Sequence, residues 1–196
     1  MAKISRIPKF GLAIDWETSG YSLPDYAKCH QGISFGAIIF DVRTFDQVEF
    51  LYREIKFDKK YEWSTGAEKV HGLTQEYLEK NGVTQEEAAT DLCNMIIKYI
   101  GTEDILLLGH RVGFDKAFTQ QLTGSVGINL SYNPVVLDTC SFGTAFMELS
   151  YSDELFDAFG FPERTAHNSL EDITLTLQTL KLMKEAFLAG LLSQMT

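Results

Sequence analysis

Two carboxylates, Asp15 and Glu17, stand one residue apart at the end of an apolar run that begins at Gly11. Such a run predicts a buried β-strand, and side chains alternate along a strand, so both carboxylates face the same side. Two neighbouring carboxylates repel each other when both are ionised, and a divalent cation relieves that repulsion. The pair is typical of an oxygen-rich site for Mg²⁺ or Mn²⁺, although a solvated strand end has the same pattern.

A second candidate group stands where the last helix is expected to begin. Asn168 is a favoured N-cap residue, and Glu171 follows at the position of a capping-box partner. His167 and Asp172 then occupy the two positions that touch across a helix entry. The spacing predicts an imidazole beside a carboxylate, which is either part of a catalytic site or a structural hydrogen bond that steadies the helix.

A third carboxylate, Asp115, falls near the start of a helix expected over residues 114–122. It shares one side of that helix with Phe118 and Leu122, which predicts that it leans toward the core. A carboxylate in that position needs a partner. The alternative is an acidic residue in a first turn, where the helix dipole favours it.

The elements that would position these groups follow from the hydrophobic pattern. Apolar or alternating runs predict strands over Gly11–Trp16, Ile33–Phe40 and Gln47–Phe57, joined by a turn at 41–46 into an antiparallel meander. Two further strands, Ile105–Leu108 and Val135–Leu137, alternate with helical segments. This order predicts an α/β fold with a mixed five-stranded sheet flanked by helices.

Helix signals are found between and after these strands. Capping boxes at Thr65 and Thr84 predict helices that end near Gly72 and Gly101. Ser152 is expected to cap a helix that ends at Gly160. The last helix is expected over 169–188, and its inner face is expected to carry Ile173, Leu177, Leu180 and Phe187.

Composition limits the class of protein. The chain has 196 residues, enough for one well-buried domain, and a formal net charge of -10. That charge argues against tight binding to long duplexes without help, but bound divalent cations would offset it where phosphate must lie. Three cysteines without a C-x-x-C pair favour a reducing, cytoplasmic location, and no apolar stretch is long enough to span a membrane.

Together the three groups resemble the DEDDh, or DnaQ-like, family of 3′→5′ exonucleases, which includes the DNA polymerase III proofreading subunit, ribonuclease T and oligoribonuclease. Four stretches carry the resemblance in family order: Ile14–Gly20, Ala67–Thr74, Gly109–Asp115 and His167–Asp172. The resemblance implies a ribonuclease-H-like fold for the mixed sheet and a single exonuclease domain over residues 1–196.

The resemblance also implies roles for particular residues. Asp15, Glu17, Asp115 and Asp172 would hold two Mg²⁺ or Mn²⁺ ions, and His167 would be the general base that activates water. Thr18, His71 and Phe114 would contact the terminal nucleoside. The expected activity is hydrolysis of terminal phosphodiester bonds at nucleic acid 3′ ends, mainly single-stranded, with release of nucleoside monophosphates.

Several alternatives stay open at this point. DNA is the favoured substrate, an exoribonuclease or oligoribonuclease is the alternative, and a non-catalytic module that binds nucleic acid or a polymerase is a more remote one. A homodimer, or a polymerase or repair partner, is compatible with the sequence. Gly32–Gly36 also matches the G-x-S-x-G element of serine hydrolases, but Ser34 begins a strand-like run rather than a strand-to-helix turn.

Two features depart from the family pattern. Arg111 stands where the family usually has asparagine, and it could pair with phosphate, pair with a neighbouring acid or point to solvent. The segment from Tyr21 to His30 is longer than expected, and its role is open.

Overall fold

The computed structural model describes residues 7–21, 26–162 and 167–193, with the side chains of 26 and 191–193 excepted. Five strands form one sheet in the order β3-β2-β1-β4-β5. Their bounds are β1 Phe10–Thr18, β2 Gly32–Asp41, β3 Gln47–Glu54, β4 Ile105–Gly109 and β5 Tyr132–Asp138. Strands β1, β2 and β3 are antiparallel, whereas β4 runs parallel to β1 and β5 parallel to β4. The predicted mixed sheet and its meander are confirmed.

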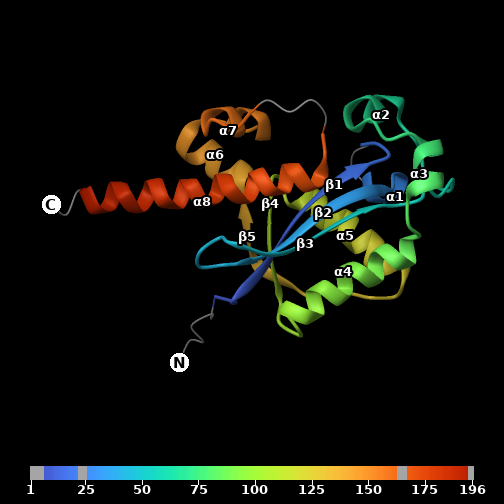
Figure 1. Cartoon of the computed structure of the whole chain (residues 1–196), viewed down its shortest axis with the longest axis horizontal. Coiled ribbons are helices and arrows are strands. Elements are labelled where there is room, and N and C mark those ends of the chain that lie inside the picture. The colour runs from blue at the N-terminus through green and yellow to red at the C-terminus, as the bar shows by residue number, and fades with distance from the viewer. Residues whose placement is uncertain (1–6, 22–25, 163–166, 194–196) are drawn as a thin grey trace.

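Helices cover both faces of this sheet. Helices α4 (Gln85–Tyr99) and α5 (Gly113–Ser125) pack on the face that carries Leu12, Ile14 and Trp16. Helix α8 (Ser169–Ser193) packs on the opposite face, which carries Ala13 and Ile38. In Figure 1, α8 crosses above the strands while α4 lies below them. Odd-numbered positions of β1 therefore face α8, which is the side on which Asp15 and Glu17 lie.

Short helices fill the connections between the longer elements. Helix α2 (Thr65–His71) and α3 (Gln75–Asn81) follow β3, while α6 (Thr139–Met147) and α7 (Ser152–Ala158) follow β5. Helix α1 (Tyr26–Cys29) lies within the segment whose role was open. The sequence pattern missed α1, α3 and α6, because helices this short carry little periodic signal.

Two expected caps are displaced by one residue. Ser64, rather than Thr65, caps α2 by accepting from the backbone N–H of Ala67, and α7 begins at Ser152 instead of being capped by it. The capping box at Thr84 is present as expected. Gly72 ends α2 at φ 73°, a left-handed conformation that glycine adopts without strain.

The last helix is longer than expected. It continues to Ser193, and Figure 1 shows its end reaching well beyond the sheet. Ile173, Leu177 and Leu180 are buried against the sheet, but Phe187 is 63% exposed. The expectation that Phe187 lies on an inner face was wrong, because the periodicity identifies a side of the helix but not where the sheet beneath it stops.

Two other readings are settled by the fold. Ser34 lies fully buried within β2, so Gly32–Gly36 is no nucleophile elbow. Within the described residues, no helix combines the length and apolar character needed to cross a membrane.

Candidate active site

The end of β1 places two carboxylates on the face of the sheet that α8 covers. Asp15 pairs with Gly36 across the strands, and Glu17 pairs with Ser34. Between them, Trp16 points to the other face, where it is 4% exposed and its Nε1 donates to Thr119 Oγ1 at 3.0 Å. The packed indole fixes the backbone on either side, so both carboxylates are directed toward α8.

Asp172 and His167 come from the start of α8. The Asn168 side chain accepts hydrogen bonds from the backbone N–H groups of Leu170 and Glu171, both at 3.1 Å, as expected of an N-cap. His167 Nδ1 lies 3.5 Å from Asp172 Oδ2. The imidazole and the carboxylate therefore meet across the helix entry, as their spacing predicted.

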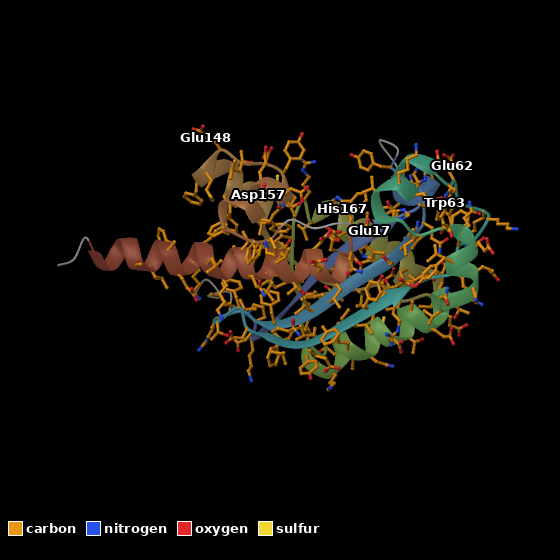
Figure 2. The ribbon with its side chains drawn as sticks, turned by 45° about the horizontal axis from the view of Figure 1, so that its top comes forward. Glu17, Glu62, Trp63, Glu148, Asp157 and His167 are labelled. Atoms are coloured by element: carbon orange, nitrogen blue, oxygen red, sulfur yellow. The ribbon has the colours of Figure 1, made fainter. Side chains whose placement is uncertain are left out.

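Glu17 completes a compact group with these two residues. One ligand atom from each of Glu17, His167 and Asp172 lies within 4.8 Å of the others. Figure 2 shows Glu17 and His167 next to each other above the sheet. Residues 150 positions apart in the sequence are thus brought within the reach of one cation.

Asp115 adjoins this group from α5. Its side chain is 2% exposed, and Oδ1 accepts the backbone N–H of Trp16 at 3.2 Å. Burial raises the pKa of Asp115 well above its ordinary value, and the charge of Asp15 raises it further. A buried carboxylate beside another carboxylate is unfavourable unless a proton or a cation neutralises it.

A glycine allows α8 to reach the site. A Cβ on Gly36 would lie only 2.4 Å from the Cα of Leu170 and 2.5 Å from the backbone oxygen of Ser169. The first turn of α8 therefore rests directly on the β2 backbone opposite Asp15. This contact sets the distance between the carboxylates of β1 and Asp172.

The donor set fits divalent cations. Carboxylate oxygens from Asp15, Glu17, Asp115 and Asp172 are the hard ligands that Mg²⁺ and Mn²⁺ prefer. Burial is the main cause of the raised pKa of Asp115, and the neighbouring charge of Asp15 adds to it. A cation placed among these oxygens would remove that penalty.

The residues expected to contact a nucleoside lie around the same end of β1. Thr18 is 8% exposed, and its hydroxyl donates to the Gly20 carbonyl. His71 Nδ1 accepts from the backbone N–H of Leu73 at 3.0 Å, so the ring proton is on Nε2. That Nε2 is buried and makes no hydrogen bond of good geometry within the described residues, although the Thr18 carbonyl is near. Burial lowers the pKa of His71, which keeps a neutral donor available beside the site.

Phe114 connects the site with the segment from Tyr21 to His30, for which the sequence predicted no role. Its ring lies 5.8 Å from that of Tyr21 and 4.9 Å from that of Phe118. Tyr21 is 61% exposed. The Gln121 side chain holds the rest of this segment against α5 by donating to the His30 carbonyl at 2.6 Å.

Sequence reasoning missed two supporting residues. Gln121 anchors the start of β2, where its Oε1 accepts the Gly32 N–H at 3.1 Å. Asp138, at the end of β5, accepts backbone N–H groups of Arg111, Val112 and Cys140 at 3.0–3.3 Å and so fixes the loop before α5. An acidic residue directly after the expected strand Val135–Leu137 was the available signal for Asp138.

Comparisons with known proteins identify the family and the fold. Residues 12–180 match the RNase_T family model, described as exonuclease. A search of curated protein sequences found no match. The fold resembles Escherichia coli exonuclease I, with a TM-score of 0.72 and 18% identity over 90% of this chain. It also resembles the nuclease domain of 3′hExo, with a TM-score of 0.69 and 14% identity over 92% of this chain.

The two similar proteins differ in the fraction of their own length that the match to this chain covers. The match covers 94% of the 3′hExo nuclease domain but only 41% of exonuclease I, so the chain spans less than half the length of the latter. The exonuclease I of Methylocaldum szegediense is covered to 40%, with a TM-score of 0.70 and 15% identity over 90% of this chain. The family match, which includes every candidate carboxylate, shows that the chain belongs to the RNase_T exonuclease family.

Proposed function

We propose that this chain is a 3′→5′ exonuclease that removes single nucleotides from single-stranded nucleic acid, with DNA favoured, by a mechanism that uses two divalent cations. The observation that carries the proposal is the group formed by Glu17, His167 and Asp172, whose ligand atoms lie within 4.8 Å of one another. Asp15 and Asp115 adjoin that group and supply the remaining carboxylates.

Each residue has a proposed part in the hydrolysis. Asp15, Glu17, Asp115 and Asp172 hold the cations, which when bound stabilise negative charge on the attacking and leaving oxygens. His167 accepts a proton from the attacking water, and Asp172 steadies its ring from 3.5 Å away. The water oxygen bonds to phosphorus while the bond from phosphorus to the 3′ oxygen of the preceding nucleotide breaks. That 3′ oxygen takes up a proton, and a nucleoside 5′-monophosphate leaves.

Contacts to the terminal nucleoside are proposed for Thr18, His71 and Phe114. His71 packs against Trp63 and lies near the Thr18 carbonyl, so its ring would form part of the wall of the nucleoside pocket. The ring of Phe114 lies 5.8 Å from the exposed ring of Tyr21, and together the two rings would offer an apolar surface to a base. These contacts would position the last phosphodiester over the carboxylates.

RNA is the second candidate substrate. Structures of exonuclease I include complexes with single-stranded DNA and with a dA16 oligonucleotide. The nuclease domain of 3′hExo has been seen bound to rAMP, and another similar structure describes recognition of a histone mRNA stem-loop by a 3′-exonuclease. Both chemistries therefore occur on this fold, and the difference depends on how the pocket treats a 2′-hydroxyl.

One assay tests the proposal. The protein is incubated with 5′-labelled single-stranded DNA, duplex DNA and RNA in Mg²⁺ or Mn²⁺, and products are resolved on a gel. A ladder that shortens from the 3′ end, abolished by EDTA and by Asp15→Ala, is expected. Equal degradation of a strand with a blocked 3′ end would show that the enzyme is no 3′ exonuclease. Calorimetric titration of Mn²⁺ into wild type and Asp172→Asn measures the metal site separately from activity.

A further inference from the structure

Arg111 occupies an unusual place in the loop between β4 and α5, four residues before Asp115. Its φ is 60°, in the left-handed region that side chains other than Asn and Asp rarely adopt. The Asp138 carboxylate maintains this conformation by accepting the Arg111 N–H at 3.0 Å and the Val112 N–H at 3.3 Å. The fold thus holds an arginine in an unfavourable conformation at the edge of the candidate site.

The side chain extends to the start of α7 and is held there. Its Cζ lies 5.2 Å from the centroid of the Tyr151 ring, and Nη2 is 3.5 Å from the carbonyl oxygen of Ser150. The backbone it meets is itself fixed. Ser150 and Tyr151 donate their N–H groups to Glu154 at 3.2 Å, and His110 Nε2 lies 3.1 Å from the Ser150 carbonyl. The position of the guanidinium is therefore set by the fold.

Its charge is available to an external anion. Four basic side chains elsewhere on the surface are engaged with carboxylates, namely Arg53, Lys60, Lys98 and Lys181. Across residues 7–21, 26–162 and 167–193, no such ion pair involves Arg111, whose side chain is exposed. In a chain with a net charge of -10, an arginine without a carboxylate partner beside a cluster of acids is suited to bind phosphate.

The geometry gives the direction of the strand. In Figure 2, Glu17 and His167 lie between Trp63 on one side and Glu148 and Asp157 on the other. The candidate nucleoside contacts Thr18 and His71 belong to the Trp63 side, since Trp63 packs against His71 with ring centroids 6.1 Å apart. Arg111 and Tyr151 lie at the start of α7, the helix that carries Asp157, so a strand whose last nucleotide lies near His71 and which crosses the carboxylates extends toward them.

We infer that Arg111 binds the phosphodiester immediately 5′ of the scissile bond, while the exposed ring of Tyr151, in contact with the guanidinium, stacks on a base of the departing single strand. The inference rests on the proposed exonuclease function. The two residues would then favour substrates with at least one nucleotide upstream of the cleaved bond. Stacking on Tyr151 is possible because its side chain is 60% exposed.

Two substrates distinguish an effect of Arg111 on binding of the upstream phosphate from an effect on the hydrolysis step itself. A single-stranded oligodeoxynucleotide has the upstream phosphate, whereas the p-nitrophenyl ester of thymidine 5′-monophosphate has a terminal nucleotide and a cleavable bond but no upstream phosphate. Arg111→Ala should raise KM for the oligonucleotide about tenfold, with kcat little changed, and leave ester hydrolysis unaltered. The slope of log kcat/KM against log salt should fall in magnitude by about 0.7, the value for one single-strand phosphate contact.

Matched variants complete the test. Arg43→Ala removes the same charge from the exposed turn at the opposite end of β2. It should change neither KM nor kcat for either substrate. Arg111→Lys should keep the salt slope, and Tyr151→Leu should raise KM for the oligonucleotide alone. Equal effects of Arg111→Ala on both substrates, or an unchanged salt slope, would overturn the inference, because the arginine would then only support the loop. Failure of the wild type to cleave either substrate would instead overturn the proposed function.

Discussion

The closest contact at the site, between Gly36 and the first turn of α8, gives a quantitative prediction. In Gly36→Ala, the new Cβ would lie 2.4 Å from Leu170 Cα and 2.5 Å from Leu170 N and Ser169 O, all of them backbone atoms. Ordinary contact begins near 3.4 Å, so the start of α8 must move by about 1 Å. Overpacking of this kind destabilises a protein by about 1–3 kcal/mol.

The same displacement should reduce activity. Asp172 lies within the turn that must move, whereas Asp15 stays on β1, so the carboxylates separate by about 1 Å. Misplacement of catalytic groups by that distance lowers turnover by roughly 10²-fold. Urea denaturation of the metal-free protein measures the stability loss, and single-turnover cleavage in Mg²⁺ measures the rate.

Gly124→Ala is the matched control. Gly124 lies in α5, and a Cβ there would meet no atom within 4 Å. This substitution should raise the free energy of unfolding by up to about 1 kcal/mol, because alanine favours the helix, and should leave cleavage intact. If Gly36→Ala kept both its stability and its turnover, the close approach of α8 to β2 would not control the site.

Three other predictions follow from the site. Because burial and Asp15 raise the pKa of Asp115 in the folded protein, the native state binds more protons than the unfolded chain between the ordinary pKa of 3.8 and the raised one. Unfolding in EDTA should therefore show wild-type stability falling as pH rises through that window, while Asp115→Asn removes the fall; parallel curves would contradict the burial argument. His167→Ala should lower kcat by roughly 10²–10⁴-fold, read by quenched-flow cleavage, and an intact rate would remove its role as base. Arg111→Asn should raise the melting temperature through a gain of about 0.5–1 kcal/mol, since asparagine tolerates φ 60°, and a lower value would mean that the loop is unstrained.

Much of the site could be predicted because its determinants are local. Alternation along β1 is enough to place Asp15 and Glu17 on one face, and the Asn168 cap is enough to bring His167 to Asp172. These patterns do not determine whether the β1 carboxylates, Asp15 and Glu17, lie close to His167 and Asp172. Their proximity depends on Gly36, because a side chain there would keep α8 away from β2. The sequence alone does not show this, since nothing in it places α8 against Gly36.

The supporting residues could not be found in this way. Asp138 acts on a loop 27 positions earlier in the chain, and Gln121 acts on carbonyl groups about 90 positions earlier. No periodicity connects such partners, because they are joined by the parallel pairing of β4 with β5 and by the packing of α5. The contact partner of the Arg111 side chain could not be predicted for the same reason, since Tyr151 lies in a connection 40 positions away.

The distribution of charge around the site has a physical reason. A basic side chain among the carboxylates would satisfy them permanently and compete with the metal ions for the same oxygens. Asp115 is buried beside Asp15, and burial together with the Asp15 charge raises its pKa. Yet the proposed substrate is a polyanion, and an acidic surface would repel every phosphate except those at the metals. A cation that helps to hold the strand must therefore lie outside the carboxylate group, and the proposed role of Arg111, restrained by Asp138 and held against Tyr151, meets this condition.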